Sequence, residues 1–280
     1  MAMKKKVTSI FVVLFLFVTA IRAEACTLWA AAGDAVAGGG TMIVKNRDWA
    51  PDHQQELRSV SPPKGYRYYG VFAIDGDDRG LKCGVNEKGL VVVNAAASSI
   101  PRVERQGMER TKALMAKLLS ECDSVEAALA KREQFLGPQF LLLADQRKVA
   151  IVEIGPGGKS SVEVKENGIL THTNHYLDPD LAYANKRIGA SSRERLARIQ
   201  TLTSEVGPFT LEDFIRMSED RAGGPDNSIW RTGSMPGKER TMATWLVALL
   251  PGKPPELYVK LANPGEAEKI VRLSGSSVFP

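Results

Sequence analysis

The sequence predicts a layered α+β domain, a four-layer αββα sandwich in which two antiparallel sheets lie between two layers of helices. Strand-like and helix-like stretches follow one another in blocks, which is the rhythm of such a domain. Some strand candidates are apolar at nearly every position, as expected for sheets covered on both faces. The 280 residues are 44% hydrophobic and 25% charged, which excludes a disordered, collagen-like or coiled-coil chain.

The first block of the chain reads as strands. Two apolar stretches at 26–32 and 41–45 are joined across three glycines at 38–40, which is typical of a hairpin. Further strands are expected at 68–74, 81–85 and 90–95. The stretch 86–89, Asn-Glu-Lys-Gly, favours a tight turn between the last two of these strands.

The spacing of apolar residues then changes. Residues 108–119 and 124–132 carry apolar side chains three to four positions apart, which indicates two amphipathic helices. Four short strands are expected next, at 140–144, 149–154, 162–164 and 169–171. The remaining elements are helices at 191–202 and 211–218, a polar loop at 227–240 and a hairpin of strands at 242–250 and 256–261. Thr210 and Asp213 have the spacing of a capping box for the second of these helices.

The first 25 residues have the composition of an export signal. Three lysines at 4–6 precede an apolar run at 10–21, and residues 23–25 read Ala-Glu-Ala. A basic start, a short apolar run and an A-x-A end are the parts of a secretory signal. The run is shorter than the ~20 residues that a membrane span needs. Cleavage after Ala25 would leave one domain, 26–280, in the bacterial periplasm, with Cys26 as its first residue.

Two other interpretations of Cys26 remain open at this point. The cysteine could be the acylated residue of a lipoprotein, although Ala23 and the charged Glu24 depart from the usual signal of that class. It could also follow an uncleaved anchor. In either alternative Cys26 is a lipid attachment site or a residue without a chemical role, and it is not a reactive nucleophile.

The net charge depends on which chain is counted. The full sequence has 37 basic and 32 acidic residues and a net charge of +5. Removal of residues 1–25 takes away four basic residues and one acidic residue, which leaves a net charge of +2. We find no zinc-finger spacing, RNA-binding aromatic motif or dense basic stripe, so a nucleic-acid partner is not expected.

The cysteine count is odd: Cys26, Cys83 and Cys122. Cys83 and Cys122 could pair or could be two separate buried thiols. A cysteine at a chain start combines a nucleophilic thiol with an α-amine whose ordinary pKa is about 7.7–8.0, so one residue supplies both nucleophile and base. Asp48 ends the stretch that follows the second strand of the hairpin, so it can lie beside this N-terminus. Its alternative role is that of a polar turn residue.

Four short motifs occur in one order: Cys-Thr at 26–27, Asn-Arg-Asp-Trp at 46–49, Asn-Glu-Lys-Gly-Leu at 86–90 and Thr-Asn-His-Tyr at 173–176. The ordered set, behind a predicted cleavage site, resembles the N-terminal nucleophile hydrolases of the choloylglycine hydrolase and penicillin acyltransferase-like superfamily. That superfamily includes linear amide hydrolases and acid ceramidase. The resemblance spans most of 26–280 and implies the αββα sandwich of that superfamily.

The resemblance also implies roles for particular residues. Cys26 would be the nucleophile, its freed amine the base, and Asp48 the acid that holds the amine. Asn174 would complete the oxyanion hole, and Asn94 matches a position near the oxyanion. Lys45 stands where bile-salt hydrolases have arginine, and it keeps the charge without the planar fork.

A further cation is implied by the stretch 191–196, Ser-Ser-Arg-Glu-Arg-Leu, which resembles the Ser-Ser-x-x-Arg stretch of the superfamily. Arg195 would be the cation near the active site, with Arg193 as the second choice. The alternative for either arginine is a solvated helix face.

The implied reaction is a two-step acyl transfer through a Cys26 thioester, which cleaves a linear C–N amide bond other than a peptide bond. The expected partners are a small-molecule N-acyl amide substrate and signal peptidase, without a cofactor. A metal is not expected either, because His172 and His175 would face opposite ways at a strand end. The alternatives are an acyltransferase of the penicillin acyltransferase type and a lipid-anchored periplasmic binding protein.

Overall fold

The computed structural model describes residues 25–75, 79–204 and 207–279 of the chain. The predicted export signal at 1–25 lies outside these residues except for Ala25. Across the described ranges, no helix is both long enough and apolar enough to cross a membrane.

One sheet has six strands in the order β10-β1-β2-β11-β12-β13, all antiparallel to their neighbours. Its strands are β1 (Ala25–Ala32), β2 (Thr41–Trp49), β10 (Gly168–His172), β11 (Arg240–Leu249), β12 (Glu256–Leu261) and β13 (Lys269–Ser274). The predicted hairpin is confirmed, since β1 pairs with β2 over its whole length.

The other sheet is a seven-stranded antiparallel meander from β3 to β9 in sequence order. Its strands are β3 (Gln55–Val60), β4 (Tyr68–Ala73), β5 (Gly80–Asn86), β6 (Val91–Ala96), β7 (Gln139–Ala144), β8 (Val149–Ile154) and β9 (Ser160–Lys165). The helices are α1 (Arg102–Gln106), α2 (Leu114–Glu121), α3 (Val125–Leu129), α4 (Ala190–Ser204), α5 (Leu211–Ser218) and α6 (Gly224–Asn227). Short 3-10 turns lie at Gly33–Ala35, Arg132–Gln134, Pro156–Gly158, Ala182–Ala184 and Gly275–Ser277.

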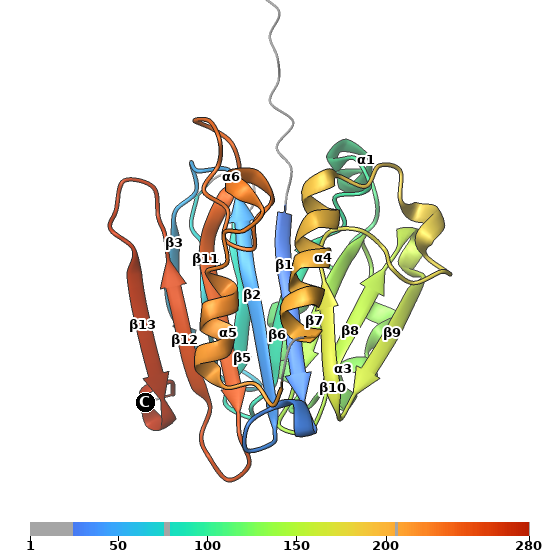
Figure 1. Cartoon of the computed structure of the whole chain (residues 1–280). Helices are drawn as coiled ribbons and strands as arrows, with labels where there is room; N and C mark the ends of the chain where they lie inside the picture. The colour runs from blue at the N-terminus through green and yellow to red at the C-terminus, as the bar shows by residue number, and fades with distance from the viewer. Residues whose placement is uncertain (1–24, 76–78, 205–206, 280) are drawn as a thin grey trace, which may run out of the picture.

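The two sheets pack face to face, and each carries helices on its outer face, so the predicted α+β sandwich is confirmed. In Figure 1, α4 and α5 lie in front of the six-stranded sheet and run roughly along its strands, and the seven-stranded sheet lies behind it. Alternate residues of β1 divide between two cores: Leu28 lies in the core between the sheets, and Trp29 packs under α5 against Phe214. A third core joins α2 and α3 to the seven-stranded sheet.

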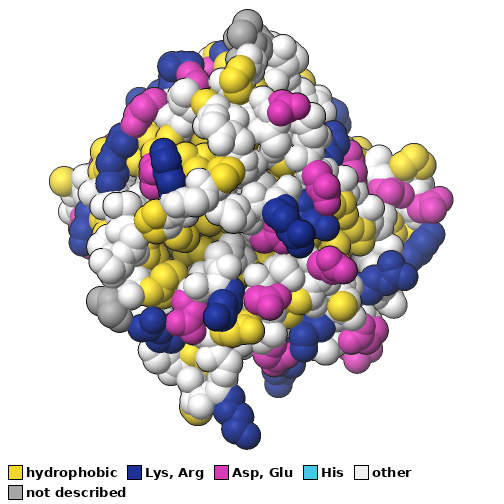
Figure 2. Space-filling view, turned by 90° about the horizontal axis from the view of Figure 1, so that it is seen from below, with side chains coloured by type: hydrophobic (Ala, Val, Ile, Leu, Met, Phe, Trp, Pro, Cys, Tyr) yellow, Lys and Arg dark blue, Asp and Glu magenta, His cyan; other side chains and the backbone are white. Residues whose placement is uncertain are grey.

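The face of the molecule in Figure 2 carries basic and acidic side chains interspersed around a hollow that shows hydrophobic side chains. The two signs are mixed on this face, in keeping with nearly balanced numbers of basic and acidic residues.

The structure differs from the sequence prediction at several elements. β2 runs on to Trp49, so Asp48 lies within the strand rather than in a turn after it. The predicted helix at 108–119 begins only at Leu114, because Thr111 donates to the backbone of Gln134 and Leu136 and Ala113 has φ 52°. β3 and β13 are strands that the apolar spacing did not indicate, because polar residues interrupt both without a regular alternation and both are partly exposed.

The turn at 86–89 is built around a buried amide. Asn86 Oδ1 accepts from the backbone nitrogens of Lys88 and Leu90, and Asn86 Nδ2 donates to the carbonyls of Leu119 and Cys122. The turn between β5 and β6 is thereby tied to the end of α2. Asn86 is fully buried, so loss of its side chain would leave several polar atoms unpaired.

We predict that Asn86→Ala lowers the free energy of unfolding by about 2–4 kcal/mol, because it leaves buried donors and acceptors unpaired. Urea denaturation of the variant and the wild-type protein measures the difference. Asn167→Ala is the control: Asn167 also makes two side-chain amide bonds, to Asp34, but at the surface, and its loss should cost under about 1 kcal/mol. Equal losses in the two variants would contradict this account.

Candidate active site

The register of the six-stranded sheet places Cys26 between two strands that carry polar groups. β1 runs antiparallel to β2, so Cys26 pairs with Arg47 and the preceding Ala25 with Asp48. On its other side β1 pairs with β10, with Leu28 opposite His172. The residues directly after β10 therefore lie beside Cys26.

Asn174, two residues after β10, makes the direct contact with Cys26. Its Oδ1 accepts a hydrogen bond of 2.9 Å from the backbone nitrogen of Cys26. Its Nδ2 donates to the carbonyl of Ala96, at the end of β6 in the other sheet, at 2.9 Å. The amide is 1% exposed and bridges the two sheets at the point where Cys26 begins the first strand.

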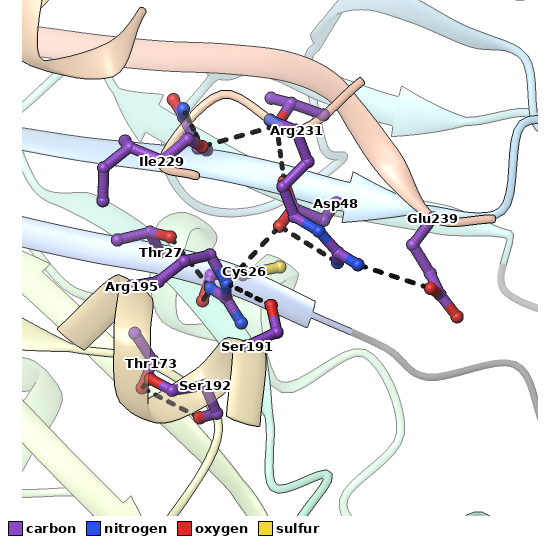
Figure 3. Close-up of polar contacts among 12 residues, drawn as sticks. Cys26, Thr27, Asp48, Thr173, Ser191, Ser192, Arg195, Ile229, Arg231 and Glu239 are labelled. Atoms are coloured by element: carbon purple, nitrogen blue, oxygen red, sulfur yellow. Dashed lines mark hydrogen bonds and ion pairs between the residues drawn. The ribbon is translucent and has the colours of Figure 1, made fainter. Parts of the chain in front are cut away.

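Arg195 reaches the same place from α4 (Figure 3). Its Nη1 donates to the Cys26 carbonyl at 2.6 Å and to Thr27 Oγ1 at 2.8 Å, and its Nη2 donates to Asn174 Oδ1 at 2.9 Å. Burial lowers the pKa of this guanidinium to about 10, opposed by the nearby Asp48 carboxylate, so it stays charged at neutral pH. Arg193, the second choice from the sequence, is exposed and donates to the Ile188 carbonyl.

Asp48 lies on the face of β2 that α4 covers, and it is fully buried. Its Oδ1 accepts from Thr241 Oγ1 at 2.8 Å. Its Oδ2 lies 3.5 Å from Arg231 Nη1 and 4.0 Å from Arg195 Nε, and it has no hydrogen-bond partner among the described residues. Burial raises the pKa of the carboxyl, against the opposing effect of Arg231 and Arg195.

Arg231 is a part of the site that the sequence interpretation missed, because it lies in the stretch expected to be a polar loop. Its guanidinium lies between Asp48 and Glu239, with Nη2 at 3.4 Å from Glu239 Oε2 (Figure 3). Its backbone pairs with Thr241 in both directions, which fixes the segment against β11. No pattern in the sequence identifies Arg231, because its position beside Asp48 depends on how its segment pairs with β11.

Asn94 stands apart from this network. Its side chain has one described contact, from Lys45 Nζ to Asn94 Oδ1 at 2.9 Å. Lys45 is 2% exposed and also donates to the Lys82 carbonyl at 2.7 Å. Four of the five residues expected from the sequence, Cys26, Asp48, Asn174 and Arg195, thus meet in one network, and Asn94 lies beside Lys45.

The other two cysteines lie in different cores, and all three thiols are free. Burial raises the pKa of Cys83 to about 12 and raises that of Cys122. These two thiols therefore stay protonated at neutral pH. Within the described ranges, the side chains form no cluster of three or more His, Cys, Asp or Glu that could hold a metal.

A buried group of hydroxyls holds the Asn174 backbone to α4. Ser192 Oγ accepts from the Asn174 nitrogen at 3.1 Å and lies 2.8 Å from His175 Nδ1. Thr173 Oγ1 donates to the Ser192 carbonyl at 3.0 Å. Burial, with the nearby His172, lowers the pKa of His175 to about 4. His175 is therefore neutral at neutral pH, and its Nδ1 and the Ser192 hydroxyl share one hydrogen bond.

This pKa predicts how stability depends on pH. Between pH 6.5 and about 4 the unfolded chain binds a proton at His175 that the folded protein does not, so the free energy of unfolding falls as pH falls through that window. His175→Asn, whose side-chain amide can donate to or accept from Ser192, should reduce this slope. Urea denaturation at several pH values measures it, and an unchanged slope in the variant would contradict the assignment.

Comparisons with known proteins place this geometry in a family. Residues 36–266 match the family described as acyl-coenzyme A:6-aminopenicillanic acid acyl-transferase. A comparison with curated proteins finds no match.

Solved structures share the fold at low sequence identity. Penicillin V acylase from Agrobacterium tumefaciens has a TM-score of 0.55 and 17% identity, over 90% of this chain and 86% of that one. A mutant conjugated bile acid hydrolase from Clostridium perfringens has a TM-score of 0.55 and 14% identity, over 89% and 92% of the two chains. The chain belongs to the acyl-coenzyme A:6-aminopenicillanic acid acyl-transferase family and has the fold of these two structures.

Proposed function

We propose that the protein is an exported cysteine hydrolase that cleaves a linear C–N amide bond, other than a peptide bond, through a thioester on Cys26. The observation that carries the proposal is the bond of 2.9 Å from the Cys26 nitrogen to Asn174 Oδ1. It supports a role for that nitrogen as a catalytic amine once signal peptidase has removed residues 1–25. A peptide nitrogen has no lone pair to offer as a base, whereas a free α-amine at the same place does.

The first step is attack by the Cys26 thiol on the amide carbon of the substrate. The α-amine takes the thiol proton, and the new bond forms between sulfur and carbon. Asn174 Oδ1 accepts from the amine and so orients the lone pair of the amine toward the thiol. Asp48 Oδ2 on the adjacent strand, which accepts no hydrogen bond from the described residues, offers a negative charge to the amine when the amine is protonated. The amine then gives its proton to the leaving nitrogen, the C–N bond of the substrate breaks, and the acyl group remains on Cys26 as a thioester.

Negative charge develops on the substrate oxygen during this attack, and it needs hydrogen-bond donors. Asn174 Nδ2 uses one hydrogen on the Ala96 carbonyl and has a second to offer. Asn94 Nδ2 is the second candidate donor, with its Oδ1 already taken by Lys45. Water then attacks the thioester and regenerates the Cys26 thiol, which completes the hydrolysis.

The class of substrate rests on the comparisons. The structural neighbours are named for penicillin V and for conjugated bile acids, both small N-acyl amides. We infer the same class for this protein, without a commitment to the acyl or amine group. The family is named for an acyltransferase, so transfer of the acyl group to a second amine is the alternative reaction. An amine acceptor added to the assay separates the two by the ratio of new amide to free acid.

We predict that Cys26→Ala abolishes hydrolysis across a panel of N-acyl amides, because both the nucleophile and its proton transfer are lost. Cys26→Ser should keep only a trace, since a hydroxyl is the poorer nucleophile at neutral pH. The assay uses the mature protein, which starts at Cys26, and measures the amine that is released from each substrate. Cys122→Ala is the matched control and should keep its activity, because Cys122 packs in the core under α2 and α3. Full activity of Cys26→Ala would end the proposal.

Export and processing are tested on the protein itself. The intact mass of the exported protein should correspond to a chain that starts at Cys26 without lipid. Iodoacetamide should then alkylate Cys26 faster than Cys83 and Cys122, whose pKa values are raised by burial. A mass that includes acyl chains on Cys26 would support the lipid-anchored binding protein instead.

A further inference from the structure

The peptide bond between Thr173 and Asn174 is held at both ends. Its carbonyl, Thr173 O, lies 3.1 Å from His172 Nδ1. Its nitrogen, on Asn174, donates to Ser192 Oγ at 3.1 Å. All of these residues are buried, so water cannot replace a lost partner.

His172 is itself held from the other side. Its Nε2 lies 2.9 Å from Glu153 Oε1, and the two side chains are 2% and 6% exposed. Glu153 belongs to β8 of the other sheet, and the same oxygen accepts from the Leu177 nitrogen at 2.8 Å. The imidazole ring packs on Phe140, with the ring centroids 4.3 Å apart.

Each ring nitrogen of His172 faces an acceptor. A backbone carbonyl can only accept a hydrogen bond, so His172 Nδ1 has to carry a proton to bond with Thr173 O. Glu153 Oε1 already accepts from the Leu177 nitrogen and faces His172 Nε2 as a further acceptor, so both ring nitrogens of His172 are donors, Nε2 toward Glu153 and Nδ1 toward the peptide. A carboxylate on the far side of an imidazole commonly orients the ring in this way.

The peptide plane in turn sets where the Asn174 side chain begins. Asn174 Oδ1 must reach the Cys26 nitrogen and Arg195 Nη2, both at 2.9 Å, while Nδ2 reaches the Ala96 carbonyl. A rotation of the peptide would shift the amide relative to Cys26. A misplacement of about 1 Å at a reacting group can cost about 100-fold in rate.

We infer that His172 is a positioning residue for the reaction: it is locked by Glu153, donates from Nδ1 to Thr173 O, and thereby holds the Asn174 amide in its working orientation. This inference rests on the proposed function, because Asn174 matters for rate only if the Cys26 site performs the chemistry. His172 touches neither the nucleophile nor, on this account, the substrate.

The first test needs no substrate. Long-range ¹H–¹⁵N NMR spectra of the imidazole rings, assigned with the His172→Asn variant, report which ring nitrogens are protonated at neutral pH. We expect a protonated Nδ1 on His172. An unprotonated Nδ1 overturns the inference, whatever the activity of the protein turns out to be.

The second test compares two substitutions. His172→Asn keeps a donor two bonds from Cβ, where the Nδ1 of histidine stands, but it cannot reach Glu153. His172→Phe keeps the packing on Phe140 and removes the donor. We expect His172→Phe to lower kcat by about 10- to 100-fold with little change in KM. His172→Asn should recover most of the loss. A residue needed only for packing would give the reverse order, and that result overturns the inference.

A control and a double variant complete the test. Tyr176→Phe removes another buried bond in the same layer, from the Tyr176 hydroxyl to the Ile154 carbonyl, and should lower stability without lowering kcat.

His172→Phe combined with Asn174→Ala should be no slower than Asn174→Ala alone, because one residue acts through the other. Additive losses overturn the inference. Activity that persists in Cys26→Ala would overturn the proposed function. The NMR spectra would still test whether His172 Nδ1 donates to the Thr173 carbonyl.

Discussion

The guanidinium of Arg195 connects the start of β1 to the turn after β10. It donates to the Cys26 carbonyl, to Thr27 Oγ1 and to Asn174 Oδ1, all within 2.9 Å. Because a guanidinium has donors in a rigid plane and no acceptor, the Asn174 amide has to present its oxygen to Arg195 and its nitrogen to the other sheet. Arg195 therefore selects which end of the amide, the oxygen rather than the nitrogen, faces Cys26.

A group of buried charges surrounds the same point. Asp48 and Glu239 face Arg195 and Arg231 in a region closed to water. Removal of one partner from a buried group of this kind costs about 3–5 kcal/mol, because another charge is left without compensation, whereas apolar replacements of the whole group are often neutral. The group therefore contributes geometry and charge to the site more than it contributes net stability. Asp48 Oδ2 lies within ion-pair distance of both arginines and accepts no hydrogen bond from the described residues, so it has room for a further donor.

The fold brings these groups together by strand register. β1 has β2 on one side and β10 on the other, so its first residues meet Asp48 from one neighbour and the Thr173–Asn174 turn from the other. The second sheet supplies the outer support: Glu153 holds His172, and the Ala96 carbonyl receives Asn174 Nδ2. The same architecture persists in solved structures at 14–17% identity, which fits a site defined by register rather than by most side chains.

Local patterns were enough to predict the hairpin of β1 and β2, the tight turn at 86–89 and the capping box of α5, because each depends on residues close in sequence. The ordered motifs also pointed to Cys26, Asp48 and Asn174, and the stretch 191–196 pointed to Arg195. Arg231 and the pairing of Glu153 with His172 carry no such pattern, because each contact joins segments that only the completed sheets bring together. The sequence by itself therefore determined the fold class and singled out four residues that lie in one network. The tertiary structure alone decided how those groups are oriented, because strand register and burial fix which donor each buried acceptor can reach.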